Sequence, residues 1–94
     1  MAGRDAGQDL VKKIICWLRS QKCVVIETKS PSIFFVKDGF WGAIEVKKTK
    51  SSPFRPGQKE MVAKLDSMSW AKVVWGGKNS NWPEVKREIE EMLR

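Results

Sequence analysis

Residues 31–47 read PSIFFVKDGFWGAIEVK, and this stretch decides the fold that the sequence predicts. Ile33 to Val36 is a short run of β-branched and aromatic residues, which favours a strand. Lys37-Asp38-Gly39 follows, and an Asp-Gly pair is typical of the tight turn of a β-hairpin. Phe40 to Val46 is expected to return as the next strand. The stretch therefore predicts an antiparallel hairpin.

The sequence on both sides of the hairpin predicts helices and two further strands. Apolar residues recur at steps of three and four between Gln8 and Ser20 and again between Gln58 and Met68, which predicts two amphipathic helices. Residues 1–7 are small and polar and are expected to be loosely ordered. The other expected elements are a strand at Cys23–Ile26 with Glu27 and Thr28 at its end, a strand at Lys72–Trp75, and a last helix that Asn81 caps.

The expected order of elements is α-β-β-β-α-β-α, which is an α/β fold. A helix joins the hairpin to the last strand, so that strand can lie parallel to one already in the sheet. The 94 residues suffice for one core, and we expect a single domain over residues 1–94.

The charge of the chain indicates a polyanionic partner. Eighteen Lys and Arg residues against eleven Asp and Glu residues leave a net charge of +7. Such an excess in a small domain favours nucleic acid, although it also serves solubility.

The sequence contains no histidine, which excludes Ser-His-Asp and Cys-His catalysis and histidine-based metal centres. Catalysis would have to use carboxylates, lysines and a metal ion. Cys16 and Cys23 are expected to be reduced thiols in the core. No stretch approaches the length of a membrane span, and the N-terminus lacks an apolar secretory segment. We therefore expect an intracellular protein.

Glu45 and Lys47 alternate with apolar residues on the second strand of the hairpin, so their side chains share one face. A carboxylate can hold Mg²⁺, and a lysine beside it can stabilise charge on a phosphate or orient a water molecule. An exposed strand face can show the same alternation. The residues around the pair are therefore needed to distinguish a metal site from an exposed strand face.

The stretch from Gln8 to Trp75 resembles the PD-(D/E)xK nuclease superfamily, and most closely the archaeal-type Holliday junction resolvases and stand-alone viral VRR-NUC domains. The resemblance is carried by Pro31-Ser32 before a strand, by Glu45-Val46-Lys47, and by Pro56-Gly57-Gln58 at the next helix. It implies a restriction-endonuclease-like α-β-β-β-α-β core with a mixed sheet flanked by helices, followed by a C-terminal helix.

The same resemblance implies a function. Glu45 would be a metal ligand, Lys47 the catalytic lysine, and Gln58 a polar partner of the lysine or of a phosphate. The cofactor would be Mg²⁺, with Mn²⁺ as a substitute. The substrate would be branched or junction DNA, bound by a homodimer in the cytoplasm of a prokaryotic or virus-infected host cell.

Position 32 departs from the family pattern, because Ser32 stands where the family has the Asp that binds the metal. A serine hydroxyl is a poor ligand for a hard divalent cation, so metal affinity and cleavage should both fall. The serine could be a deliberate replacement that silences a nuclease. It could be natural and mark a DNA-binding protein with a decayed site. Alternatively, another carboxylate could replace the lost ligand.

Four other acidic residues are candidates for that ligand. Asp38 precedes Glu45 in the sequence, but the expected hairpin turn would put it at the opposite end of the strand from position 32. The family often has an acidic residue on the first helix; the alignment gives Gly7 there, with Asp5 and Asp9 nearby, and we choose Asp9. Glu27 ends the first expected strand.

The loop from Lys47 to Gly57 is basic, and its hydroxyl groups could bond phosphates. Lys48, Lys50 and Arg55 are the candidates for contact with the DNA backbone. Trp17 and Trp75 are expected in the core. Trp41, Trp70 and Trp82 could line a dimer surface or stack on an unpaired base.

Together these features predict a Mg²⁺-dependent, structure-specific DNA endonuclease. A module of the same fold that binds DNA without cutting it is the alternative. A small RNA-binding or ribosome-associated protein is a weaker third option.

Overall fold

The computed structural model of the chain describes residues 6–94, and it confirms the expected order of elements. The elements are α1 (Ala6–Ser20), β1 (Val24–Glu27), β2 (Ile33–Lys37), β3 (Phe40–Lys47), α2 (Gln58–Met68), β4 (Ala71–Trp75) and α3 (Trp82–Met92). The first helix begins at Ala6, so Gly7 is helical rather than loosely ordered. Residues 1–5 lie outside the described residues.

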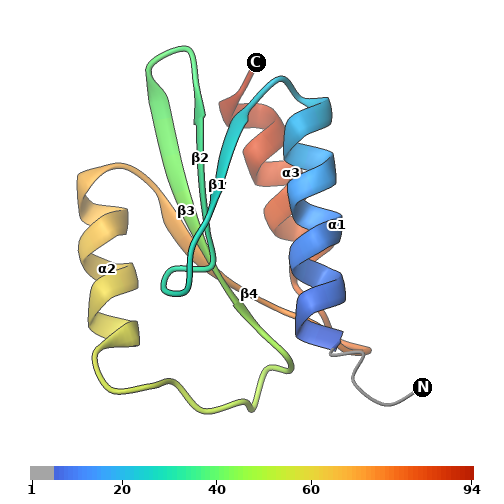
Figure 1. Cartoon of the computed structure of the whole chain (residues 1–94), viewed down its shortest axis with the longest axis vertical. Helices are drawn as coiled ribbons and strands as arrows, with labels where there is room; N and C mark the ends of the chain where they lie inside the picture. The colour runs from blue at the N-terminus through green and yellow to red at the C-terminus, as the bar shows by residue number, and fades with distance from the viewer. Residues whose placement is uncertain (1–5) are drawn as a thin grey trace.

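The four strands form one mixed sheet in the order β1-β2-β3-β4. The pairs β1–β2 and β2–β3 are antiparallel, and β4 runs parallel to β3. Helices α1 and α3 lie on one side of the sheet and α2 lies on the other (Figure 1). The architecture is therefore the α/β layout with a mixed sheet and flanking helices that the sequence predicts.

The hairpin turn is where the Asp-Gly pair predicts it. Asp38 and Gly39 both have positive φ angles, 50° and 83°, and Lys37 pairs with Phe40 across the turn. Two consecutive positive φ angles match the twist of the flanking strands, and Asp and Gly tolerate them well. Asp38 is thus a turn residue at the opposite end of the strands from Ser32.

The main core lies between the sheet and the helices α1 and α3. Ile14, Leu18, Ile33, Phe35, Ile44, Val74 and Ile89 are all fully buried there. The expectation that Trp70 and Trp82 line a surface is wrong, because both are buried. Their rings complete the core, where Trp82 meets the half-buried Trp17 edge to face at 5.5 Å.

The two cysteines are both free thiols, but only one belongs to the core. Cys23 is buried, and burial raises the pKa of its thiol. Cys16 is exposed. The expectation for Cys16 is wrong because its position turns away from the face of α1 that carries the buried Ile14, Ile15 and Leu18.

The start of α3 is fixed in a different way from the expected cap. The side chain of Asn81 makes no capping bond. Its Oδ1 accepts a hydrogen bond from the backbone N–H of Trp75, and its Nδ2 donates to the carbonyl of Val73, both at 2.9 Å. Asn81 therefore joins α3 to β4, while the hydroxyl of Ser80 accepts a hydrogen bond from the N–H of Trp82.

The opposite face of the sheet is only partly covered. Helix α2 contributes no buried residue. On the neighbouring strands, Val24 and Ile26 are 65% and 52% exposed, and Val24 pairs with the exposed Val36. An apolar surface therefore remains beside α2. Within residues 6–94, no helix has the length and apolar character to cross a membrane.

Candidate functional site

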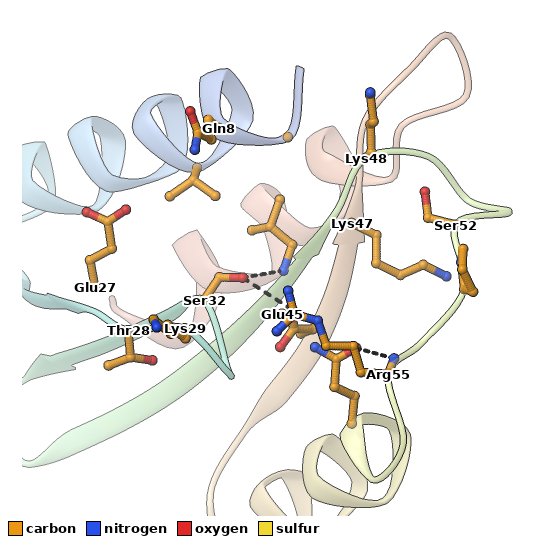
Figure 2. Close-up of a pocket in the computed structure, with 15 residues that line it drawn as sticks. Gln8, Glu27, Thr28, Lys29, Ser32, Glu45, Lys47, Lys48, Ser52 and Arg55 are labelled. Atoms are coloured by element: carbon orange, nitrogen blue, oxygen red, sulfur yellow. Dashed lines mark hydrogen bonds between the residues drawn. The ribbon is translucent and has the colours of Figure 1, made fainter. Parts of the chain in front are cut away.

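A pocket of about 410 Å³ opens where β1 and β3 end, β2 begins, and the first turns of α1 and α2 approach the sheet. It is lined by Gly7, Gln8, Val11, Glu27, Thr28, Lys29, Ser32, Glu45, Val46, Lys47, Lys48, Ser52, Pro53, Arg55 and Gln58. The residues that the sequence singles out from separate segments therefore line one pocket: Ser32 before β2, Glu45 and Lys47 on β3, and Gln58 at the start of α2. Figure 2 shows Ser32, Glu45 and Lys47 at this pocket.

Glu45 is the buried carboxylate of this pocket, with an exposed fraction of only 4%. The hydroxyl of Ser32 donates to Glu45 Oε2 at 3.3 Å, and the hydroxyl of Ser30 donates to Oε1 at 3.4 Å. Ser32 Oγ also accepts a hydrogen bond from the backbone N–H of Val46 at 3.0 Å. Figure 2 shows Ser32, which immediately precedes β2, facing Glu45 on β3.

The strand register explains why residues 13 positions apart meet. Ile33 pairs with Ile44 in the antiparallel β2–β3 ladder, so Ser32 and Glu45 come next on either side of that pair. Residues opposite each other in such a ladder point to the same face, with Cβ atoms about 5 Å apart. Position 32 is therefore held against the Glu45 carboxylate by the hairpin itself.

Gln58 is connected to Glu45 through Ser30, a residue that the motifs in the sequence do not single out. Its Nε2 donates to Ser30 Oγ at 3.4 Å, and its Oε1 accepts from the backbone N–H of Arg55 at 2.8 Å. Gln58 thus holds two groups in place: the backbone of Arg55 at the end of the basic loop, and the Ser30 hydroxyl that donates to Glu45. The Ser-Pro-Ser turn before β2 is the only signal in the sequence that could have indicated Ser30.

Burial raises the pKa of the Glu45 carboxyl above its usual range. The hydrogen bonds from Ser32 and Ser30 and the positive charge of Arg55 oppose this rise without cancelling it. Removing a carboxylate from water disfavours its charged form, and hydroxyl donors compensate only in part.

This raised pKa predicts how stability depends on pH. Between the unfolded and the folded pKa the folded chain binds more protons, so its free energy of unfolding should fall as pH rises through that interval. In the Glu45→Gln variant the free energy of unfolding should not decrease over this interval, and the variant should be more stable than the unaltered chain at neutral pH. Urea unfolding with a chelator present, from below pH ~4.3 to neutral pH, measures this. Superimposable curves for the two chains would contradict a raised pKa.

Lys47 lies at the same pocket, but its ammonium group turns toward the basic loop. Its Nζ donates to the carbonyl of Lys50 at 3.1 Å and lies 4.2 Å from the centre of the Phe54 ring. Figure 2 shows the side chain extending away from Ser32 toward the segment that carries Ser52. To act on a bound phosphate, Lys47 would have to exchange these contacts.

Acidic residues around the pocket are few. Glu27 lines it together with Glu45, while Asp9 is exposed on α1 and is not among the lining residues. The candidate Asp5 lies outside the described residues. Over residues 6–94 no three His, Cys, Asp or Glu side chains come together in a way that could hold a metal ion.

The three basic candidates separate in the structure. Lys48 and Arg55 line this pocket, whereas Lys50 lines a second one. The loop's hydroxyls also bond within the loop: Thr49 Oγ1 and Ser52 Oγ lie 3.0 Å apart, and Ser52 Oγ accepts a hydrogen bond from the N–H of Thr49. The loop is therefore ordered by its own hydrogen bonds, with the side chains of Lys48 and Lys50 exposed.

No protein-family model matches this chain, and a search of curated proteins finds no match. The family resemblance therefore stays a prediction that rests on the motif residues.

Proposed function

We propose that this domain is built as a metal-dependent, structure-specific DNA endonuclease of the type that resolves branched or four-way DNA, and that Ser32 holds back hydrolysis in this form. Glu45 and Lys47 are the proposed catalytic pair, and Gln58 positions the loop and the hydroxyl beside them. The experiment that tests the proposal is cleavage of a labelled four-way junction in Mg²⁺ or Mn²⁺ by this chain and by its Ser32→Asp variant.

The observation that carries the proposal is the 3.3 Å separation between Ser32 Oγ and Glu45 Oε2. A carboxylate at position 32 would lie beside that of Glu45 in a pocket that Lys29, Lys48 and Arg55 also line. Two such carboxylates are a common way to hold Mg²⁺ in front of a phosphate. The proposal thus depends on a contact between two side chains as well as on a motif.

Among residues 6–94, the side chains at the pocket do not by themselves complete a Mg²⁺ site. Glu45 is already satisfied by two hydroxyl donors, and burial disfavours its charged form. Glu27 is the only other acidic residue lining the pocket in the described part of the chain. A serine hydroxyl adds little affinity for a hard cation.

The alternative is a DNA-binding module that does not cut. The small number of carboxylates at the pocket favours it. Both the endonuclease and the binding module require the same basic surface. DNA binding is therefore expected of both, and only a test of DNA hydrolysis distinguishes them.

Lys48 and Arg55 should anchor the DNA backbone at this pocket. We expect the double variant Lys48→Ala, Arg55→Ala to bind junction DNA more weakly. The slope of log K against log salt should become shallower by about two, because each lost phosphate contact reduces the magnitude of this slope by about 0.9. Fluorescence anisotropy over a salt series measures this. The matched control is Lys12→Ala, Arg87→Ala, which removes the same charge from exposed positions that do not line the pocket. Equal slopes for both pairs would contradict the assignment.

The proposal includes a homodimer. The exposed side chains of Val24, Ile26 and Val36 adjoin one another on the uncovered face of β1 and β2. Pairing this face with a second copy would remove apolar surface from water, and two-fold symmetry suits a four-way junction. Sedimentation equilibrium tests it, and a monomer at all concentrations would contradict it.

A further inference from the structure

A second pocket, of about 460 Å³, lies between the loops that follow the parallel strands β3 and β4. It is lined by Thr49, Lys50, Ser51, Trp75, Gly76, Gly77, Lys78 and Asn79. The expectation that Trp75 belongs to the core is wrong, because its side chain is only half-buried and forms part of this surface pocket.

The indole ring of Trp75 is held by its edge. The ring's Nε1 donates to the carbonyl of Asn79 at 2.8 Å. The backbone N–H of Trp75 donates to Asn81 Oδ1 at 2.9 Å. The Nζ of Lys50 lies 5.7 Å from the ring centre. With its only polar atom satisfied, the ring offers the pocket an aromatic surface of fixed orientation next to a positive charge.

This pocket adjoins the candidate active site. Trp75 pairs with Lys47 in the β3–β4 ladder, and the N–H of Gly76 donates to the carbonyl of Lys47 at 3.1 Å. A Cβ atom at position 76 would lie 2.9 Å from the carbonyl oxygen of Lys48, so glycine allows the two loops to close together. Lys47 and Lys48 line the first pocket, and the next residues along the chain line the second.

The chemistry of the lining selects a ligand class. Of the pocket's residues, all within the described part of the chain, two are lysines and none carries a carboxylate. An aromatic surface with lysine ammonium groups beside it suits a nucleobase together with its phosphate. Thr49, Ser51 and Asn79 add groups that can hydrogen-bond to a base or a sugar.

We propose that the Trp75 pocket binds an unpaired nucleotide of a DNA strand whose neighbouring phosphate lies over the Glu45 pocket. This inference rests on the proposed function and deepens it, because it says how branched DNA that carries unpaired nucleotides, such as a flap, is distinguished from a plain duplex. Bases inside a duplex are already stacked on each other and cannot reach an indole surface, whereas an unpaired base at a branch can.

The test uses binding without divalent cations, so that it is independent of cleavage. Anisotropy is measured for a fluorescein-labelled duplex with an oligo-dT flap and for the same duplex fully paired. We expect Trp75→Ala to bind the flapped DNA about tenfold more weakly, because the variant loses one base–indole stack, and to bind the paired DNA with almost unchanged affinity. Trp75→Phe should restore most of the preference. Trp41→Ala, which alters another half-buried indole outside both pockets, should keep it.

A second measurement covers the case in which Trp75→Ala does not fold. Flap DNA should quench part of the tryptophan fluorescence of the unaltered chain, and that part should be missing in Trp75→Phe. Three results would overturn the inference without bearing on the Glu45 site. They are an equal loss of affinity for both DNAs in Trp75→Ala, fluorescence quenching that persists in Trp75→Phe, and tighter binding of an unpaired RNA flap than of the DNA flap. Failure of the unaltered chain to bind either DNA would overturn the proposed function as well.

Discussion

Ser32→Asp should give the domain Mg²⁺-dependent cleavage of a four-way junction, at a rate about a hundredfold or more above that of the unaltered chain. The side chain at position 32 already contacts Glu45 Oε2 at 3.3 Å. A second carboxylate there would repel the first until a cation bound between them, and Mg²⁺ prefers such oxygen ligands. A bound metal can stabilise a phosphoryl transition state by several kcal/mol, and about 1.4 kcal/mol is worth a factor of ten in rate.

The measurement is the rate of nicking of an end-labelled junction in Mg²⁺, in Mn²⁺ and in a chelator. Ser32→Asn is the matched control, because it has nearly the shape of aspartate without its charge and should not cut. Mg²⁺ should also raise the melting temperature of the aspartate variant alone, which reports binding of the metal separately from catalysis. A Ser32→Asp chain that binds Mg²⁺ and junction DNA without cutting would refute the endonuclease and leave the binding module.

In the Ser32→Asp background, Lys47→Met should lower cleavage by about a hundredfold or more while the stabilisation by Mg²⁺ is retained. Positive groups aimed at charge that develops in the transition state contribute about this much. Methionine keeps most of the length of the lysine stem and can still pack on Phe54, so the change removes chiefly the ammonium group.

Lys48→Met is the control for that variant, since Lys48 lines the same pocket and carries the same charge. It should weaken DNA binding with little effect on the cleavage rate at saturating DNA. Single-turnover cleavage at saturating enzyme separates the two effects. Unchanged cleavage in Lys47→Met would mean that Lys47 serves only to hold the loop through the Lys50 carbonyl and the Phe54 ring.

The order of elements could be predicted because each depends on a local pattern. The Asp38-Gly39 turn requires two positive φ angles, and α2 has the bounds Gln58–Met68 that its apolar spacing predicts. The tryptophans could not be assigned in this way. Trp70, Trp75 and Trp82 all lie at or next to the ends of strands or helices, where burial depends on which element packs above, and all three were expected in the wrong environment.

The sequence by itself determined the α/β class, the hairpin, the basic loop, and the pairing of Glu45 with Lys47 on one strand face, since these follow from the period of a strand and from turn chemistry. Only the tertiary structure decided what surrounds Glu45. The register of β2 against β3 places Ser32 on its carboxylate, and Ser30 and Gln58 reach it from separate elements. The tertiary structure also directs the Lys47 side chain toward the basic loop and leaves Trp75 at the surface. Contacts between distant segments depend on how sheet and helices pack, and no local pattern in the sequence encodes that packing.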